Sequence, residues 1–67
     1  MKWVEKAGRL RANRNGWKME VWPSGDLWLY YVKGTTMRYP WTGSRLTQKQ
    51  AISAAETTLA FEVNKPS

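Results

Sequence analysis

The 67 residues include neither cysteine nor histidine, and this absence limits how such a chain can be stabilised. A domain of this length has a core only just large enough to hold a fold, and many add disulfides or a metal. Disulfides need Cys, and structural zinc sites need Cys or His. Hydrophobic burial must therefore carry the fold of one small domain. Five Trp, three Tyr and one Phe supply the large side chains for it.

The clearest local pattern is a helix near the C-terminus. Thr47 and Gln50 fit a capping box, and Leu46 and Ala51 stand at the positions of a hydrophobic staple. Asn64 is the expected C′ residue. Apolar residues recur at helical spacing between these ends: Ala51, Ile52, Ala55, Leu59 and Val63. We predict a helix that begins after Thr47, and its alanines indicate close approach to a bulky surface.

Three segments before this helix are rich in strand formers. They are residues 17–22, 27–33 and 36–41. Residues 23–26 and Gly34-Thr35 separate them and are typical of turns. The pattern predicts an α+β fold in which a three-stranded antiparallel sheet packs on one C-terminal helix.

The chain divides by composition into three parts. Residues 1–16 are the most basic stretch and form either a mobile arm or, because Arg9–Asn13 alternates, a fourth short edge strand. Asn15-Gly16 is a turn signal. Residues 17–63 make up the β-β-β-α domain, and residues 64–67 are a tail.

The hairpin registers assign each strand residue to a face. With turns at Ser24-Gly25 and Gly34-Thr35, directly opposed residues fall on the same face. The layer predicted to meet Ile52, Ala55, Leu59 and Val63 of the helix comprises Trp17, Met19, Val21, Trp28, Tyr30, Val32, Met37, Tyr39 and Trp41. The opposite face comprises Lys18, Glu20, Trp22, Leu27, Leu29, Tyr31, Lys33, Thr36, Arg38 and Pro40.

This opposite face mixes cations with large apolar side chains. Exposed apolar patches usually mark an interaction site. The alternative is that residues 1–14 fold over the face, with Trp3, Val4 and Leu10 covering it.

Residue types needed for catalysis are scarce. The chain has no His or Cys and a single Asp, and no two carboxylates are spaced for paired acid–base work. The serines have no histidine to activate them, and the glycines match no phosphate-binding loop. We expect no enzymatic activity, no cofactor and no metal. No apolar run is long enough to span a membrane, and the first residues lack a signal-peptide core. We expect a soluble, cytoplasmic protein.

The formal net charge is +6, which favours polyanionic partners. The first interpretation is a small module that binds duplex DNA. Its contacts would come from Lys18, Lys33, Arg38, Tyr31, Trp22, Arg9, Arg11 and Arg14, with Lys2 and Lys6 extending the basic stretch. The rival interpretation is a protein-binding module, such as a phage-encoded inhibitor of a host protein, that uses Trp22, Leu27, Leu29 and Tyr31. A homodimer through the same patch is a third alternative.

The order of elements also resembles two known families of DNA-binding domain. Trp-rich strands at 17–21 and 27–31 are followed by the Ala-rich helix segment 51–56. This arrangement resembles the arm-binding N-terminal domain of tyrosine recombinase integrases and the plant ethylene-response-factor domain. Small phage and mobile-element proteins look similar. The resemblance covers residues 17–63 and implies that the sheet face away from the helix, with Lys18, Lys33 and Arg38, enters the DNA major groove.

Overall fold

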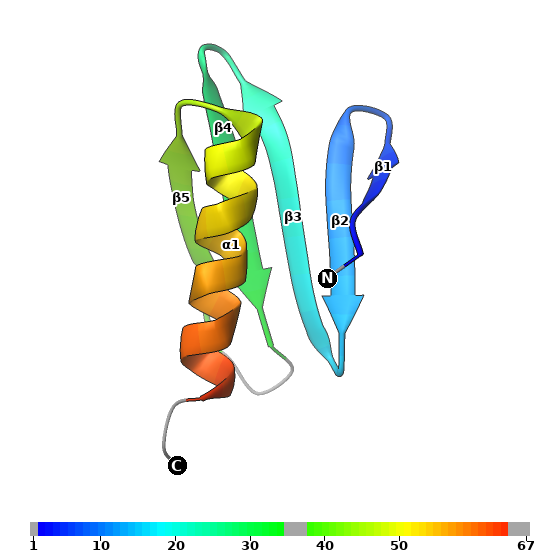
Figure 1. The fold of residues 1–67 in the computed structure, drawn as a ribbon, viewed down its shortest axis with the longest axis vertical. Coiled ribbons are helices and arrows are strands. Elements are labelled where there is room, and N and C mark those ends of the chain that lie inside the picture. The colour runs from blue at the N-terminus through cyan, green and yellow to red at the C-terminus, as the bar shows by residue number, and fades with distance from the viewer. Residues whose placement is uncertain (1, 35–37, 65–67) are drawn as a thin grey trace.

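The chain folds into one antiparallel sheet followed by one helix, as a computed structural model shows for residues 2–34 and 38–64 (Figure 1). The strands lie in the sheet in sequence order. The elements are β1 (Val4–Lys6), β2 (Arg9–Arg14), β3 (Trp17–Ser24), β4 (Leu27–Lys33), β5 (Trp41–Arg45) and α1 (Gln48–Val63). The α+β class and the C-terminal helix are confirmed. The predicted strand count of three or four is wrong, because the sheet has five strands.

Two-residue turns join the first four strands. Asn15 and Gly16 both have positive φ, at 50° and 86°, as a type I′ turn requires. Ala7 and Gly8 do the same between β1 and β2, at 54° and 80°. Alanine is an unusual residue for this conformation, since its Cβ crowds the following carbonyl at a cost of roughly 1–2 kcal/mol. The sequence therefore gives little sign of the β1–β2 turn.

The β3–β4 hairpin turns one residue later than predicted. Ser24 pairs with Leu27, so Gly25-Asp26 is the turn. A turn at Ser24-Gly25 would pair Val21 with Trp28, whereas Val21 pairs with Tyr30. Gly25 alone has positive φ there, at 60°, as in a type II′ turn. The pairing differs from the predicted one by two residues. Because side chains alternate with a period of two, the predicted faces of β3 and β4 are preserved.

The last strand begins where the predicted third strand ended. Thr36 and Met37 lie outside the described residues, and Arg38–Pro40 are not in a strand. Trp41 pairs with Val32, and Gly43 pairs with Tyr30.

Gly43 explains this register. A Cβ on Gly43 would stand 2.5 Å from the Tyr30 hydroxyl oxygen, so the Tyr30 ring occupies the space that a side chain would need. The predicted turn at Gly34-Thr35 would place Tyr39 opposite Tyr30 in the core, but the Tyr39 side chain is 75% exposed, so this assignment is wrong.

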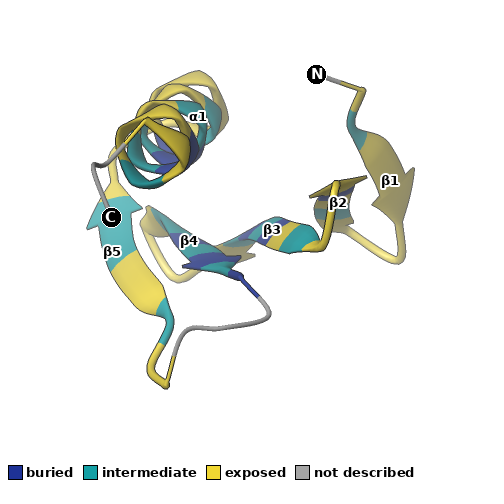
Figure 2. Cartoon of the chain, turned by 90° about the horizontal axis from the view of Figure 1, so that it is seen from below, coloured by how far each residue is buried: buried dark blue, intermediate teal, exposed yellow. Residues whose placement is uncertain are grey.

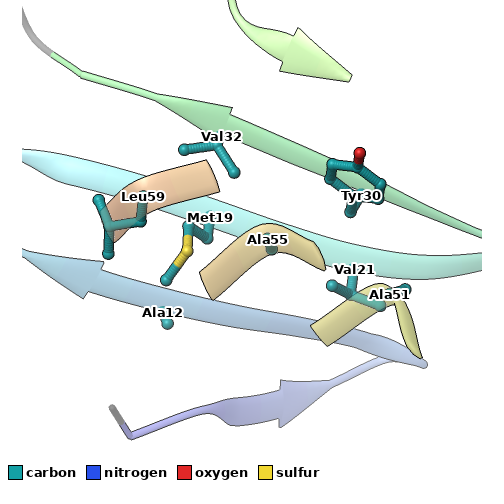
Figure 3. Packing of buried hydrophobic residues seen from close by; sticks show 8 residues of the cluster. All are labelled: Ala12, Met19, Val21, Tyr30, Val32, Ala51, Ala55 and Leu59. Atoms are coloured by element: carbon teal, nitrogen blue, oxygen red, sulfur yellow. The ribbon is translucent and has the colours of Figure 1, made fainter. Parts of the chain in front are cut away.

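Helix α1 covers one face of β3, β4 and β5, while the β1–β2 hairpin extends beyond it (Figure 2). The two alanines at the centre of the contact, Ala51 and Ala55, are fully buried, as their predicted close approach requires. The core side chains gather between helix and sheet (Figure 3). They are Ala12, Met19, Val21, Tyr30, Val32, Ala51, Ala55 and Leu59.

The predicted core was too large at its margins. Trp17, Trp28 and Ile52 are only half-buried against it. Trp41 and Val63 are exposed, so their assignment to the core is wrong.

Two indole–carboxylate hydrogen bonds connect the margins of the sheet to the helix. Trp3, which precedes β1, donates from Nε1 to Glu56 Oε2 at 2.9 Å. Trp41, on β5, donates from Nε1 to Glu62 Oε1 at 3.0 Å. These two strands are the edges of the sheet, so the helix is held from both sides.

The N-terminal segment therefore does not cover the face away from the helix. Leu10 pairs with Val21 and packs against the core, and Trp3 reaches the helix. Val4 is exposed. The alternative in which residues 1–14 fold over the opposite face is wrong for the described residues.

The predicted N-cap of α1 is confirmed, whereas the predicted C-terminal capping residue stands one position away from its expected place. Thr47 is the N-cap, and its Oγ1 accepts a hydrogen bond from the Gln50 backbone N–H at 3.1 Å. Leu46 is 73% exposed, which leaves little apolar contact for a staple. Asn64 is the C-cap rather than the C′ residue, and its N–H donates to the Ala60 carbonyl.

Replacing the cap tests the helix start. Thr47→Ala should lower the free energy of unfolding by about 0.5–2 kcal/mol, because the Gln50 N–H loses its acceptor. Thr57→Ala is the matched control, since Thr57 is exposed within the helix and Ala is the better helix former. Urea denaturation would measure both. Equal stability of the two variants would contradict the cap.

A second substitution tests the β4–β5 register. Gly43→Ala should cost about 1–3 kcal/mol of unfolding free energy, because the new methyl group meets the Tyr30 ring. The same change in a Tyr30→Leu background should cost less. Thermal unfolding of the parent, the two single variants and the double variant would measure this difference. Identical costs in both backgrounds would refute the Gly43–Tyr30 pairing.

Candidate binding face of the sheet

The face of the sheet away from α1 is here called the outer face. No other helix or strand of residues 2–34 and 38–64 lies over it (Figure 2). Pairing register assigns its members, which are Val4, Lys6, Arg9, Arg11, Asn13, Lys18, Glu20, Trp22, Ser24, Leu27, Leu29, Tyr31, Lys33, Thr42 and Ser44.

One row across the outer face joins cations to an aromatic ring. Lys6 pairs with Arg9, and Trp22 pairs with Leu29. The Arg9 guanidinium carbon lies 4.8 Å from the centroid of the Trp22 ring, within the range of a cation–π contact. Arg9 therefore covers part of the indole while keeping its charge in solvent.

The next row is organised by a single carboxylate. Glu20 Oε1 accepts a hydrogen bond from Arg11 Nε at 3.0 Å and forms an ion pair with Arg9 Nη1 at 3.5 Å. The Glu20 side chain is only 17% exposed. One negative charge thus positions two guanidinium groups, and each keeps N–H donors for another partner. Tyr31 pairs with Glu20 on the other side.

The third row places two like charges opposite each other. Lys18 pairs directly with Lys33, and Asn13 completes the row. Neither lysine makes an ion pair with any described residue. Like charges directly opposed destabilise an antiparallel pair. A local conflict of this kind is typical of a functional surface.

The structure brings most of the predicted contact residues together. Those on the outer face are Lys18, Lys33, Tyr31, Trp22, Arg9 and Arg11. Arg14 is not among them, since it pairs with Trp17 on the helix side. Arg38 is exposed in the connection before β5, outside the sheet, so its predicted strand position is wrong.

The sequence predicts that Lys6, Arg9 and Arg11 add phosphate contacts, but it does not predict the β1–β2 hairpin that places them on this surface. Lys6 joins the outer face through its pairing with Arg9. Part of the hairpin is indicated by the sequence, because Arg9 and Arg11 alternate with Leu10 and Ala12 as in a strand with one polar face. The role of Glu20 as partner of both arginines had no signal in the sequence.

Charge is distributed unevenly between the two sides of the molecule. The outer face carries five cations, Lys6, Arg9, Arg11, Lys18 and Lys33, against one carboxylate. The remaining acids lie elsewhere: Glu5 shares the helix-side face with Leu10, Asp26 is in a turn, and Glu56 and Glu62 are on α1. The positive charge is therefore concentrated on the uncovered side of the sheet.

The grooves of the molecule lie beside the helix and collect little charge. One, of about 700 Å³, runs between β5 and α1, and Arg45 is the one charged side chain among the described residues that line it. The Arg45 guanidinium already lies 5.3 Å from the Tyr30 ring centroid. A second groove, of about 480 Å³, has Arg14 opposite Glu56. Neither groove matches the outer face as a site for anions.

Two other kinds of site are absent from residues 2–34 and 38–64. No group of three His, Cys, Asp or Glu side chains there is arranged to hold a metal ion. No helix there has the length and apolar character to cross a membrane.

Comparisons with protein-family models, with curated proteins and with solved structures give no match. The candidate site therefore rests on its own residues and geometry.

The opposed lysines give a stability prediction. Lys18→Glu should raise the free energy of unfolding by about 0.2–1 kcal/mol, because it replaces repulsion with a cross-strand ion pair. Lys33→Glu should do the same. The double variant restores like charges and should lose the gain. Denaturant titration would measure all three, and a destabilised Lys18→Glu protein would contradict the pairing.

Proposed function

We propose that this chain is a small nucleic-acid-binding module whose outer face is the binding surface. The observation that carries the proposal is the set of five cations around half-buried aromatic side chains on a sheet face that no described helix or strand covers. Polyanion binding would relieve the repulsion between Lys18 and Lys33. It would also use the guanidinium groups that Glu20 already positions.

The resemblance in element order supports the same choice of face. Integrase arm-binding domains and ethylene-response-factor domains use the sheet face away from the helix, and that face corresponds to the outer face here. The extension by β1 and β2 adds Lys6, Arg9 and Arg11 to it. A three-stranded sheet alone would lack these cations.

The rival proposal, a protein partner, has weaker support. Trp22, Leu29 and Tyr31 lie together on the outer face but are half-buried by their neighbours, and Arg9 lies over Trp22. Leu27 is 39% exposed at the end of β4. The apolar area open to a protein, or to a second copy of the chain, is therefore smaller than the sequence indicated.

Charge reversal at Lys18 tests the proposal. We expect Lys18→Glu to weaken binding of a labelled oligonucleotide by about tenfold or more, equivalent to at least about 1.4 kcal/mol. Between about 50 and 200 mM salt, the slope of log affinity against log salt should fall by roughly one unit for each lost phosphate contact. Fluorescence anisotropy measures both quantities. Loss of folding cannot explain the effect, because the variant should be at least as stable as the parent.

Lys49→Glu is the matched control. It makes the same change in net charge at an exposed position in the first turn of α1, where a carboxylate suits the helix dipole. We expect it to bind almost like the parent. Equal losses for the two variants would show that net charge alone, and not the outer face, governs binding. If the parent protein bound neither single strands nor duplexes, the proposal would be refuted.

A further inference from the structure

We infer that the outer face binds single-stranded rather than duplex nucleic acid, with bases stacked on Trp22 and Tyr31. This inference rests on the proposed function and names its ligand class. It departs from the duplex DNA of the sequence-based hypothesis on two observations, namely where the cations lie and which side chains they border.

Three of the five cations of the outer face lie on one side of its aromatic centre, which is formed by Trp22 and Tyr31. Lys6 is on β1, and Arg9 and Arg11 are on β2, while Trp22 and Tyr31 are on β3 and β4. On the opposite side, β5 contributes only Thr42 and Ser44 to the outer face. Lys18 and Lys33 close one end of the centre.

This asymmetry fits one phosphate backbone better than two. The major groove of B-DNA is about 12 Å wide and is bordered by a phosphate backbone on each side. Five strands spaced about 4.8 Å apart make a face wider than that groove. A groove-binding sheet would gain from cations at both margins, and the β5 margin of the outer face has none. A single strand can lie with its phosphates along β1 and β2.

The aromatic centre presents ring faces on which bases can stack, and only bases that are not already stacked in a duplex can use them. In a duplex, both faces of each base pair are already stacked, so ring faces of the protein meet only edges and sugars. Exposed bases of a single strand stack on aromatic rings and on guanidinium planes. Trp22 and Tyr31 are diagonal neighbours across β3 and β4, at a spacing of about 7–8 Å. This separation suits consecutive bases of an extended strand.

Arg9 and Glu20 extend this arrangement. Arg9 lies over Trp22, so a base at this position stacks on the guanidinium plane that the indole supports. Glu20 lies between the arginines and Tyr31, and its carboxylate repels phosphate from the centre. The phosphates are therefore confined to the cationic side, and the bases lie over β3 and β4.

The experiment compares a mixed-sequence single strand of about ten nucleotides, within the usual range of site sizes, with a hairpin duplex of the same length. We expect the single strand to bind about tenfold tighter or more. Tyr31→Leu and Trp22→Leu should each weaken single-strand binding about 5- to 150-fold, the loss of one stacked base. The salt slope should stay unchanged, because neither side chain contacts phosphate. Tyr31→Phe keeps the ring and should retain the affinity.

Two controls complete the design. Phe61→Leu removes an exposed aromatic ring on α1 and should have no effect. Arg38→Ala removes the cation of the connection before β5 and should leave single-strand affinity unchanged. Circular dichroism of each variant separates unfolding from lost contacts.

The outcomes separate the two proposals. A duplex that binds as tightly as the single strand, with Tyr31→Leu harmless, would overturn the single-strand inference and leave the nucleic-acid proposal standing. Absence of binding to both oligonucleotides would remove both. An effect of Phe61→Leu equal to that of Tyr31→Leu would move the site away from the outer face.

Discussion

A single helix has to bury one face of a five-stranded sheet, and the rest of the structure depends on how it does so. Sixteen residues make α1 about 24 Å long, enough to follow the strands but not to span the sheet sideways. Ala51 and Ala55 bring its axis close to β3 and β4, where the core is completely buried. Farther out, Trp3 and Trp41 donate hydrogen bonds to carboxylates on the helix, and Trp3 also packs against the core.

This arrangement leaves the outer face with most of the net positive charge of the chain. Carboxylates on α1 accept from the indoles, so Glu56 and Glu62 are committed to the helix side. The outer face retains Glu20 as its one acid and must hold its cations without further neutralisation. The Lys18–Lys33 pair costs stability in a domain with no disulfide to offset it. Such a cost is easiest to understand if a polyanion occupies the face during function.

The parts of the fold that the sequence predicts well are those set by local pattern. Thr47 caps α1 through a bond to a residue three positions away, and alternation in β3 and β4 fixes their faces even though the register was two residues off. The missed parts depend on contacts between distant residues. Nothing near Gly43 marks a strand, because the reason for it is the ring of Tyr30 on the neighbouring strand. Likewise β1 pairs with β2 through a turn at Ala7-Gly8, and local propensity disfavours Ala7 in that conformation.

The same distinction separates the predicted from the unpredicted part of the outer face. Alternation alone assigns Lys18, Tyr31 and Lys33 to the outer face, so the sequence is enough to predict their side. The predicted position of Arg38 is wrong because the strand predicted at 36–41 does not form there. The cation-free margin at β5 depends on where that strand begins, and hence on Gly43. With the predicted strand at 36–41, Arg38 would have stood on that margin and the face would have matched a duplex groove. The later start of β5 places Arg38 outside the sheet, and for this reason we propose a ligand with one phosphate backbone rather than two.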